Sequence, residues 1–420
     1  MRHSQSSLLL SEPNQDRTVR QEQHLSFKGN ESEGRHGWLR LTPAYSIHLV
    51  QDLVAGLSRH DVVLDPFCGT GTTALLCAQS GIVCDTVDIN PFLIWLTSAK
   101  CARYSLADIG EAHSFVARLT ADGLDGREAW SPPIKDIHKW WSAADLPALS
   151  GLFAHICEGS KEGCRDLLLV AFCRTAIGTA AVSFGHQSMS FRRSDSQPTL
   201  FDDEPSHRVL AHFRRAVSDV LRSAAEAPHG TVKAVLGDSR HLDRFLPSER
   251  YTAVITSPPY PNRMSYIREL RPYMYWLGHL RDGRQAGELD WKAIGGTWGC
   301  ATSLVAKWEP DPRLKIGWPG LYGCIQDIKK HSDLLGRYVH KYFEDVALHI
   351  ASLARVLAAG ARLHYVVGNS KFYDVLVPTE EIFASLFSAT GMSEVSIQRI
   401  RKRTSKKELF EFVVHARKGP

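Results

Sequence analysis

Long apolar runs are absent from this chain. In its 420 residues no such run approaches the roughly 20 residues that a membrane-spanning helix needs. The first 32 residues are polar, of mixed charge, and lack the apolar centre of a secretory signal. We therefore expect no membrane role, a disordered lead-in over residues 1–32 and a cytoplasmic location.

Paired cysteines are missing as well. The nine cysteines are odd in number and include no C-x-x-C pair, which argues against a disulfide framework and against a zinc site. No residue is therefore expected to bind a metal. Internal repeats of fixed period are also absent, which excludes repeat folds. The net charge of +5 suits a polyanionic partner but does not identify one.

What the sequence does contain is a series of short apolar runs that end in turn residues, several of them followed by a helical pattern. The first two such units occupy residues 61–80 and 82–102. Two consecutive strand–helix units predict a parallel, doubly wound α/β sheet. A long helix is predicted over 335–357, closed by Gly360. Further strands are predicted at residues 232–236, 251–256, 362–367, 394–400 and 408–416.

A glycine-rich turn, DPFCGTGTT, follows the first predicted strand at Asp65–Thr73. Gly69 and Gly71 let the backbone turn tightly and approach a ligand, and the next helix offers free N–H groups. Such turns occur in many α/β proteins, and with Ala74 as a third small residue this one also suits a nicotinamide cofactor. The turn alone does not choose among these interpretations.

Acidic residues follow the next two predicted strands. Asp88, at the end of the second strand, suits a carboxylate that binds both ribose hydroxyls of an adenosyl cofactor. Asp238, after the strand at 232–236, is placed to accept a hydrogen bond from an adenine amine. Each acid could instead be a solvated loop residue or a helix cap.

The sequence TSPPY at Thr256–Tyr260 directly follows the apolar run YTAVI. The two prolines donate no backbone N–H and force a stiff path, which fixes the direction of the carbonyls and of the Ser257 hydroxyl. Acceptors at Ser257 and at the Pro258 carbonyl could bind both hydrogens of an exocyclic base amine and favour a pyramidal nitrogen. Tyr260 offers a flat face to a flipped base, worth about 1–3 kcal/mol. The alternative is a proline-stiffened turn, and the SPP at Ser131, with no strand before it, is interpreted as a chance copy.

Together these motifs resemble the amino-methyltransferases of DNA modification, which form N4-methylcytosine or N6-methyladenine. The resemblance rests on DPFCGTGTT, VDINP at Val87, GDSRHLD at Gly237 and TSPPY, in the family's strand order. It implies a seven-stranded, mostly parallel class I methyltransferase sheet with a helical and a recognition insertion, and S-adenosyl-L-methionine as cofactor. The cofactor-binding residues that it implies are Asp65, Phe67, Gly69, Gly71, Thr72, Asp88, Ile89, Asp238 and Ser239, and the catalytic residues are Ser257, Pro258, Pro259 and Tyr260.

The resemblance also divides the chain after the lead-in. We expect the cofactor-binding half over residues 36–103, a helical insertion with possible DNA contacts over 104–228, the catalytic half over 229–280, a target recognition insertion over 281–334, and the C-terminal part of the sheet over 335–420.

Basic residues near the predicted catalytic loop and in two other places could contact DNA phosphates, although each group could also be a solvated charged face. Asn369, after a strand end, is expected to face the base pocket. The aromatic residues Tyr273, Tyr275 and Trp276 have helical spacing and are expected in the core. The residues predicted to bind DNA are Arg192, Arg193, Arg263, Arg401, Lys402 and Arg403.

The expected product is N4-methylcytosine in double-stranded DNA, formed after base flipping. In the family that the chain resembles, the serine form of the SPPY tetrapeptide is more typical of cytosine N4 enzymes and the aspartate form of adenine N6 enzymes. No Pro-Cys nucleophile of the cytosine C5 type occurs in a comparable loop. An adenine N6 enzyme, an RNA amino-methyltransferase and a catalytically silent DNA-binding subunit remain as alternatives. A cognate restriction enzyme is a possible partner.

Overall fold

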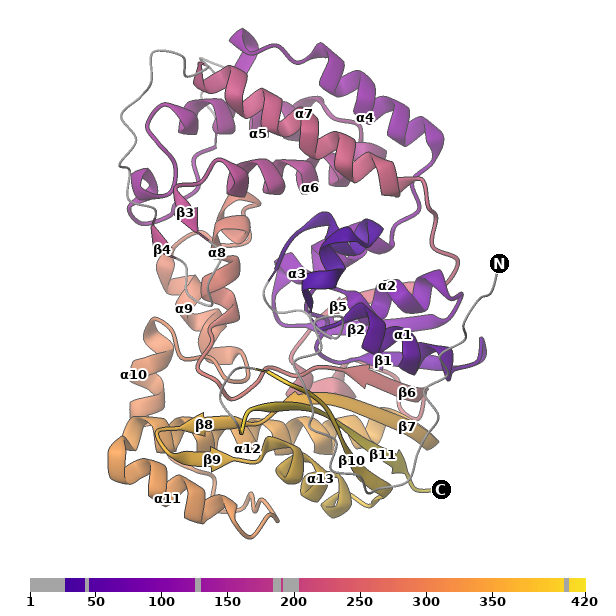
Figure 1. The fold of residues 1–420 in the computed structure, drawn as a ribbon, viewed down its shortest axis with the longest axis vertical. Coiled ribbons are helices and arrows are strands. Elements are labelled where there is room, and N and C mark those ends of the chain that lie inside the picture. The colour runs from indigo at the N-terminus through magenta and orange to yellow at the C-terminus, as the bar shows by residue number, and fades with distance from the viewer. Residues whose placement is uncertain (1–26, 42–44, 125–129, 184–189, 192–203, 404–407) are drawn as a thin grey trace.

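The computed structural model describes residues 27–41, 45–124, 130–183, 190–191, 204–403 and 408–420. Its centre is a seven-stranded sheet in the order β10-β11-β7-β6-β1-β2-β5 (Figure 1). Neighbouring strands from β5 to β7 are parallel, and β11 is antiparallel to both β7 and β10. The strands are β1 Val62–Asp65, β2 Val83–Asp88, β5 Val232–Leu236, β6 Tyr251–Thr256, β7 Leu357–Gly368, β10 Met392–Lys402 and β11 Phe410–Lys418.

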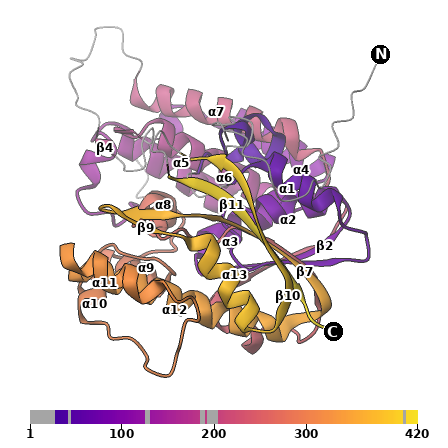
Figure 2. The same ribbon diagram turned by 60° about the horizontal axis from the view of Figure 1, so that its bottom comes forward.

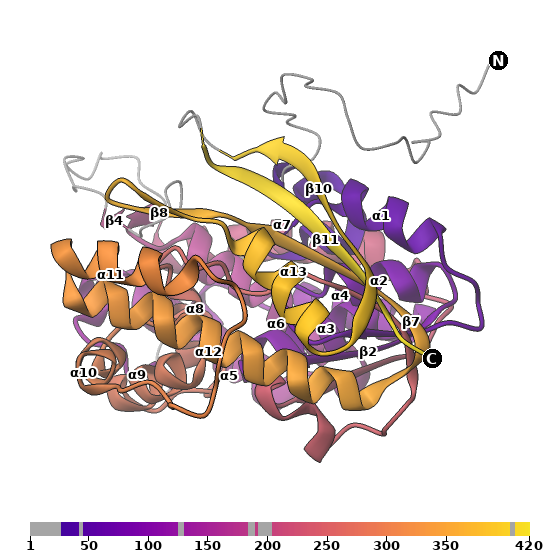
Figure 3. The ribbon, with the colours of Figure 1, turned by 90° about the horizontal axis from the view of Figure 1, so that it is seen from below.

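This strand order, with one antiparallel strand inserted beside an edge strand of a parallel sheet, is the class I methyltransferase fold. The expected fold class is therefore confirmed. Connections between the parallel strands place helices on both faces, as parallel sheets require. The Val63 and Ile255 side chains pack with α1 and α2 on one face, and those of Leu64 and Val254 pack with α12 on the other. In Figure 3, α12 runs along one side of the sheet. The helices around the sheet are α1 Ile47–Ala55, α2 Thr72–Gln79, α3 Pro91–Cys101, α12 Asp333–Val356 and α13 Thr379–Ala389.

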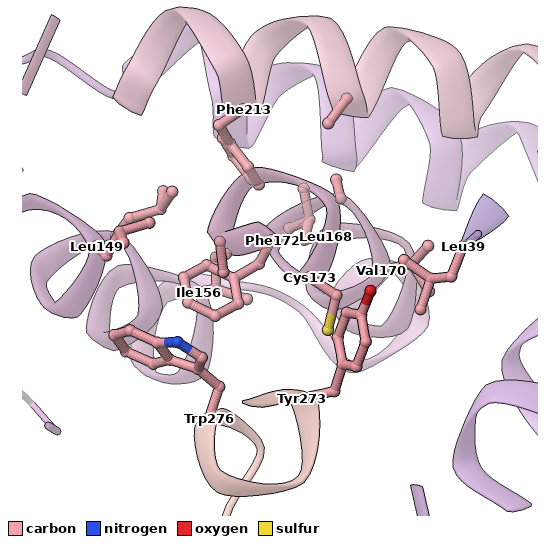
Figure 4. Close-up of a cluster of buried hydrophobic side chains, with 14 of the residues drawn as sticks. Leu39, Leu149, Ile156, Leu168, Val170, Phe172, Cys173, Phe213, Tyr273 and Trp276 are labelled. Carbon is pink, nitrogen blue, oxygen red and sulfur yellow. The ribbon is translucent and has the colours of Figure 1, made fainter. Parts of the chain in front are cut away.

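A second group of helices lies between β2 and β5 in the chain and forms its own apolar core beside the sheet (Figure 1). Helix α8, Tyr266–Trp276, contributes side chains to this core, among them Tyr273 and Trp276 (Figure 4). The Trp276 ring meets those of Trp141 and Phe172 edge to face, with centroids 5.5 and 5.1 Å away. The expectation that Tyr273, Tyr275 and Trp276 are core residues is confirmed. This group contains α4 Leu106–Arg118, α5 Asp145–Gly159, α6 Glu162–Gly178, α7 Pro205–Ala224, and the short strands β3 Val182–Ser183 and β4 Ser190–Phe191.

A third group of helices follows α8 and lies together at one end of the molecule (Figure 2). A hairpin that follows β7 packs against its last helix. Among the described residues no helix has both the length and the apolar character needed to cross a membrane. The elements of this end are α9 Gly283–Lys292, α10 Cys300–Lys307, α11 Leu321–His331, β8 Ser370–Phe372 and β9 Val375–Val377.

Two predicted boundaries are wrong. The disordered lead-in expected over residues 1–32 is too long, because residues 27–32 form a short 3-10 helix in which the Asn30 side chain donates to the Tyr45 carbonyl at 2.9 Å. The other boundary is the end of the long helix. The long helix ends at Val356, and β7 begins at once with Leu357, which pairs with Tyr251. Gly360 therefore lies inside β7 and not at the end of the helix. Its φ of 73° is left-handed, and the register between β6 and β7 shifts opposite it. Glycine marks an irregularity of the strand here, which a helix-ending signal resembles in sequence.

Candidate active site

The predicted functional residues gather where the parallel strands β1, β2, β6 and β7 end. The carboxyl ends of parallel strands meet at one edge of a sheet, and ligands of open α/β sheets bind outside that edge. Asp65 ends β1, Asp88 ends β2 and Ser257 follows β6. The sheet thus brings the predicted cofactor and catalytic residues to a common edge.

The glycine-rich loop after β1 is held by the end of β2. Asp88 accepts hydrogen bonds from the backbone N–H of Gly69 at 3.0 Å and of Asn90 at 2.9 Å. Gly71 has a φ of 76°, and a Cβ there would lie 2.5 Å from the Thr97 hydroxyl. Glycine is required at this position both by the backbone angle and by the lack of space. Burial raises the pKa of the Asp88 carboxyl to about 6.

Asp65 lies beneath this loop and joins it to the catalytic strand. Its carboxylate accepts from the Thr256 hydroxyl at 2.6 Å and from the Phe67 N–H at 3.2 Å, and the side chain is fully buried. Within the described part of the chain, its second oxygen has no hydrogen-bond partner. Burial therefore raises the Asp65 pKa to about 7. The residue supports the loop from below and does not reach its surface.

A buried lysine on α3 also supports the loop. The Lys100 ammonium donates to the carbonyls of Thr70 at 3.0 Å and His36 at 3.3 Å. Burial lowers its pKa to about 8. Nothing in the sequence pattern pointed to Lys100, because a lysine on an amphipathic helix is ordinarily exposed.

The acid predicted to bind adenine is engaged by an arginine. Arg240 contacts both oxygens of Asp238, at 2.6 Å from Nη2 and 3.0 Å from Nε, and reaches Asp345 at 2.7 Å. Burial raises the Asp238 pKa, but hydrogen bonds and the charge of Arg240 outweigh that effect, and the net pKa is lowered. Asp238 is therefore a carboxylate with part of its hydrogen-bonding capacity already used.

Two other predicted cofactor residues meet at His349. The imidazole Nδ1 donates to the Ser239 carbonyl at 2.9 Å, and Nε2 accepts from the Tyr365 hydroxyl at 2.7 Å. The Phe67 ring packs against this imidazole with centroids 4.7 Å apart. Burial lowers the His349 pKa to about 4, so that the ring is neutral and fixed between the first and third cofactor motifs. Ile89 is half-buried, and Thr72, the first residue of α2, is buried.

The catalytic loop is fastened to the sheet and to α12. Ser257 Oγ donates to the Val366 carbonyl on β7 at 3.0 Å. The Tyr342 hydroxyl on α12 donates to the Pro259 carbonyl at 2.7 Å, and the Tyr338 hydroxyl accepts from the Arg263 N–H at 3.2 Å. The proline-stiffened path is thus fixed at several points. The tyrosines of α12, spaced four residues apart, share the face that carries these contacts.

The hydroxyls of Ser257 and Tyr260 each direct their hydrogen to an acceptor of the protein. Ser257 directs its hydrogen to a carbonyl, and Tyr260 directs its own to the Glu411 carboxylate at 2.8 Å. Neither the Val366 carbonyl nor the Glu411 carboxylate can donate a hydrogen bond to these hydroxyls. Both oxygens therefore offer lone pairs to a bound molecule, which suits a donor such as an amine.

The structure places two of the predicted DNA-binding residues beside this loop. The Arg403 guanidinium lies over the Tyr260 ring at 4.8 Å from its centroid and donates to the Asn369 carbonyl at 2.8 Å. Arg401 pairs with Glu411 at 2.7 Å. Arg263 is exposed and has a left-handed φ of 63°. Lys402 is half-buried. Arg192 and Arg193 lie outside the described residues.

The expectation for Asn369 is wrong. Its side chain is buried, with the amide nitrogen donating to the Glu408 carbonyl and the oxygen accepting from the Phe410 N–H, both at 2.9 Å. Asn369 fastens the hairpin of β10 and β11 and does not face a base pocket.

The fold is that of the class I methyltransferases, and the predicted motifs lie in order at its carboxyl edge. No family model matches the chain. It is 21% identical to the type II methyltransferase M.BsoBI of Geobacillus stearothermophilus, over 90% of this chain and 82% of that protein. Identity is also 21% with M.AvaI of a Nostoc strain, over 88% of this chain and 81% of that protein, and with M.MvaI of Kocuria varians, over 77% and 73%.

A solved structure, the rRNA methyltransferase aviRa of Streptomyces viridochromogenes, aligns over 93% of this chain and 92% of its own. Its TM-score is 0.29 and its identity 12%. Values this low say nothing about a shared substrate.

Proposed function

We propose that the chain transfers a methyl group from S-adenosyl-L-methionine to cytosine N4 in double-stranded DNA, with the target base flipped out of the helix. The observation that carries the proposal is that the Ser257 hydroxyl donates to the Val366 carbonyl, which leaves its oxygen able to accept from an amine. The similarity over most of the chain to type II methyltransferases supports DNA as the substrate and a restriction-modification setting with a cognate restriction enzyme.

The cofactor edge fits an adenosyl sulfonium in its chemistry. The N-terminus of α2, which follows the glycine-rich loop, offers backbone N–H groups to a carboxylate. Asp88 accepts one hydrogen bond per oxygen, from Gly69 on the loop and from Asn90 after β2, and keeps lone pairs for ribose hydroxyls. Asp238 keeps its charge beside Arg240 and could still accept from an adenine amine. Bound S-adenosyl-L-methionine supplies a methyl group on a positively charged sulfur.

The chain's own residues prepare the attacking amine. The lone pair of an exocyclic amine is delocalised into the base ring, so the nitrogen is a poor nucleophile. Hydrogen bonds from the amine to Ser257 Oγ and to the Pro258 carbonyl favour a pyramidal nitrogen with a localised lone pair. As the N–C bond forms and the S–C bond breaks, positive charge develops on nitrogen and both acceptors stabilise it. The extra proton then passes to solvent.

The choice of cytosine over adenine rests on Ser257. An aspartate at this position is more typical of adenine N6 enzymes in the family that the chain resembles. No cysteine lies in the catalytic loop at 256–265, so the C5 route through a covalent base adduct has no nucleophile there.

Mass spectrometry of nucleosides tests the proposal directly. Duplex DNA is treated with the protein and S-adenosyl-L-methionine that carries a labelled methyl group, and label is expected in N4-methylcytosine. Label in N6-methyladenine would transfer the assignment to adenine, and label only in RNA would overturn the DNA assignment. The variant Ser257→Ala is the negative control.

A further inference from the structure

Glu411, at the start of β11, holds the hydroxyl of the proposed base-binding tyrosine. Its Oε1 accepts from Tyr260 at 2.8 Å, and its Oε2 accepts from Arg401 Nε at 2.7 Å. The carboxylate is buried, with a residue exposure of 6%. A buried carboxylate needs a charged partner or hydrogen bonds, and here both of its oxygens have one.

An irregularity in β10 aims Arg401 at this carboxylate. Arg399 pairs with Phe412, but Arg401 pairs with Glu411, so β10 advances by two residues while β11 advances by one. The extra residue is a β-bulge, which turns the side chains that follow it to the opposite face. Arg399 accordingly lies over the Phe410 ring at 4.6 Å, while Arg401 reaches the other face and Glu411. In a regular strand Arg399 and Arg401 would share a face.

The ring of Tyr260 is fixed by a glycine and an arginine. Gly368, the register partner of Glu411 on β7, leaves room that a Cβ would fill at 2.9 Å from Tyr260 Cδ2 and 2.5 Å from Arg403 Nη1. Arg403 lies over the ring and is itself bonded to the Asn369 carbonyl. The orientation of the Tyr260 ring is therefore set by Gly368 and Arg403, whereas its hydroxyl is held by Glu411. All three residues lie at the ends of β7, β10 and β11.

We propose that Glu411 and Arg401 are positioning residues for methyl transfer, which fix the place of Tyr260 against the flipped base and keep its hydroxyl from donating to the acceptors of that base. An ionised carboxylate can only accept, so the Tyr260 hydrogen points to Glu411 and its lone pairs point elsewhere. Arg401 orients the carboxylate through its hydrogen bond to Oε2. This inference rests on the proposed function, because Tyr260 must face the base for its polarity to matter.

The test is the nearly isosteric variant Glu411→Gln, whose amide can donate to Tyr260 and reverse the polarity of its hydroxyl. Methylation kcat/KM is expected to fall about tenfold to a hundredfold, the effect of losing a hydrogen bond to a charged group, with cofactor affinity unchanged. Glu408→Gln is the matched control, because Glu408 lies in the same hairpin, is exposed and pairs with the half-buried Lys371 side chain at 2.7 Å. It is expected to keep the wild-type rate.

A double-variant cycle separates positioning from a general structural role. If Glu411 acts through the tyrosine hydroxyl, Glu411→Gln has no further effect on kcat/KM in a Tyr260→Phe background. The proposal would be overturned if the fold-losses of kcat/KM in the two single variants multiply in the double variant. It would also be overturned if Glu411→Gln alone keeps the wild-type rate. Should Glu411→Gln unfold, Glu411→Asp keeps the charge for Arg401 but withdraws the carboxylate from Tyr260, and is expected to lose rate in the same way.

A second readout does not depend on activity. The 13Cζ resonance of Tyr260 in protein with labelled tyrosine, assigned by its loss in Tyr260→Phe, is expected to shift in Glu411→Gln and not in Glu408→Gln. An unshifted resonance would disprove the contact itself. A shifted resonance in a protein that labels no nucleic acid would instead refute the proposed function and, with it, the role in methyl transfer.

Discussion

At the scale of single residues, the chemistry depends on where hydroxyl hydrogens point. The Ser257 hydroxyl donates to a strand carbonyl and the Tyr260 hydroxyl to a carboxylate. Both hydroxyl oxygens are therefore left as hydrogen-bond acceptors. A reacting carbonyl or phosphoryl oxygen would need donors at the same place. The hydrogen-bond pattern thus favours amine substrates on grounds independent of the sequence motif.

The variant Ser257→Ala removes one of these acceptors. Turnover is expected to fall about tenfold to a hundredfold, while the dissociation constant of the cofactor stays as in the wild type. Ser131→Ala, in the exposed second SPP sequence, is the matched control and is expected to be silent. Single-turnover rates and calorimetric titration of the cofactor measure the two quantities. Equal rates for Ser257→Ala and the wild type would remove Ser257 from the site.

Asp88 has two tasks, since it holds the glycine-rich loop and is proposed to bind the ribose. Asp88→Ala is expected to weaken cofactor binding more than tenfold, because a charge-assisted hydrogen bond and the loop geometry are lost together. Isothermal calorimetry measures the affinity, and thermal denaturation verifies that the variant is folded. Unchanged affinity in a folded variant would contradict the assignment.

Asp65 gives stability a defined pH dependence. Its pKa is about 7 in the fold against an ordinary 3.8, so the folded state keeps a proton that the unfolded chain releases between these values. The free energy of unfolding is therefore expected to fall as the pH rises through this range. Denaturant titrations at pH values of about 5 and 7.5 measure it. Asp65→Asn, a neutral isostere, is expected to show a smaller decrease than the wild type, and an equal decrease would place the titration on other buried carboxyls.

At the scale of elements, the strand ends were the most predictable part of the molecule. β5 and β6 have the predicted bounds, because each apolar run stops where a loop with predicted site residues begins. β6 is buried between helix layers, whereas β5 is an edge strand without a buried residue. The helices α9 to α11 were not predicted, since the segment at 281–333 that contains them is rich in glycine, tryptophan and proline, which conceals the apolar periodicity of its short helices. The partners Arg240, Glu411 and Arg401 could not be assigned either. Their contacts depend on turn geometry, strand register and a bulge, which no local pattern encodes.

The hairpin of β10 and β11 divides its basic residues between two roles, which alters how DNA binding should be tested. Arg401 and Arg403 support Tyr260, so their loss would confound catalysis with binding. Lys402→Gln and Arg263→Gln are the cleaner variants. Each is expected to flatten the log–log dependence of DNA affinity on salt by about 0.9, the value for one phosphate contact.

Arg355→Gln is the control for this measurement, because Arg355 ends α12 just before β7 starts and so lies at the opposite edge of the sheet. It is expected to leave the slope unchanged. A slope that no longer depends on Lys402 or Arg263 would mean that both side chains face solvent and not DNA.

At the scale of the whole molecule, the catalytic loop links two separate apolar cores. The sheet core contains β6, which leads into the loop, and α8 begins at Tyr266 and ends inside the core of the helical insertion. The loop at 256–265 therefore connects the sheet, which carries the predicted cofactor residues, to the core of the helical insertion through a few residues of chain.

This continuity limits how far the protein can be taken apart. The Trp276 ring packs against Phe153 of α5 and Phe172 of α6, so a shortened chain without residues 104–228 would expose aromatic surface on the helix that follows the loop at 256–265. The insertion cannot be exchanged for that of a relative as an independent cassette. Any chimaera that exchanges residues 104–228 must carry α8 with them, and must then rejoin the chain within the few residues between Tyr260 and Tyr266.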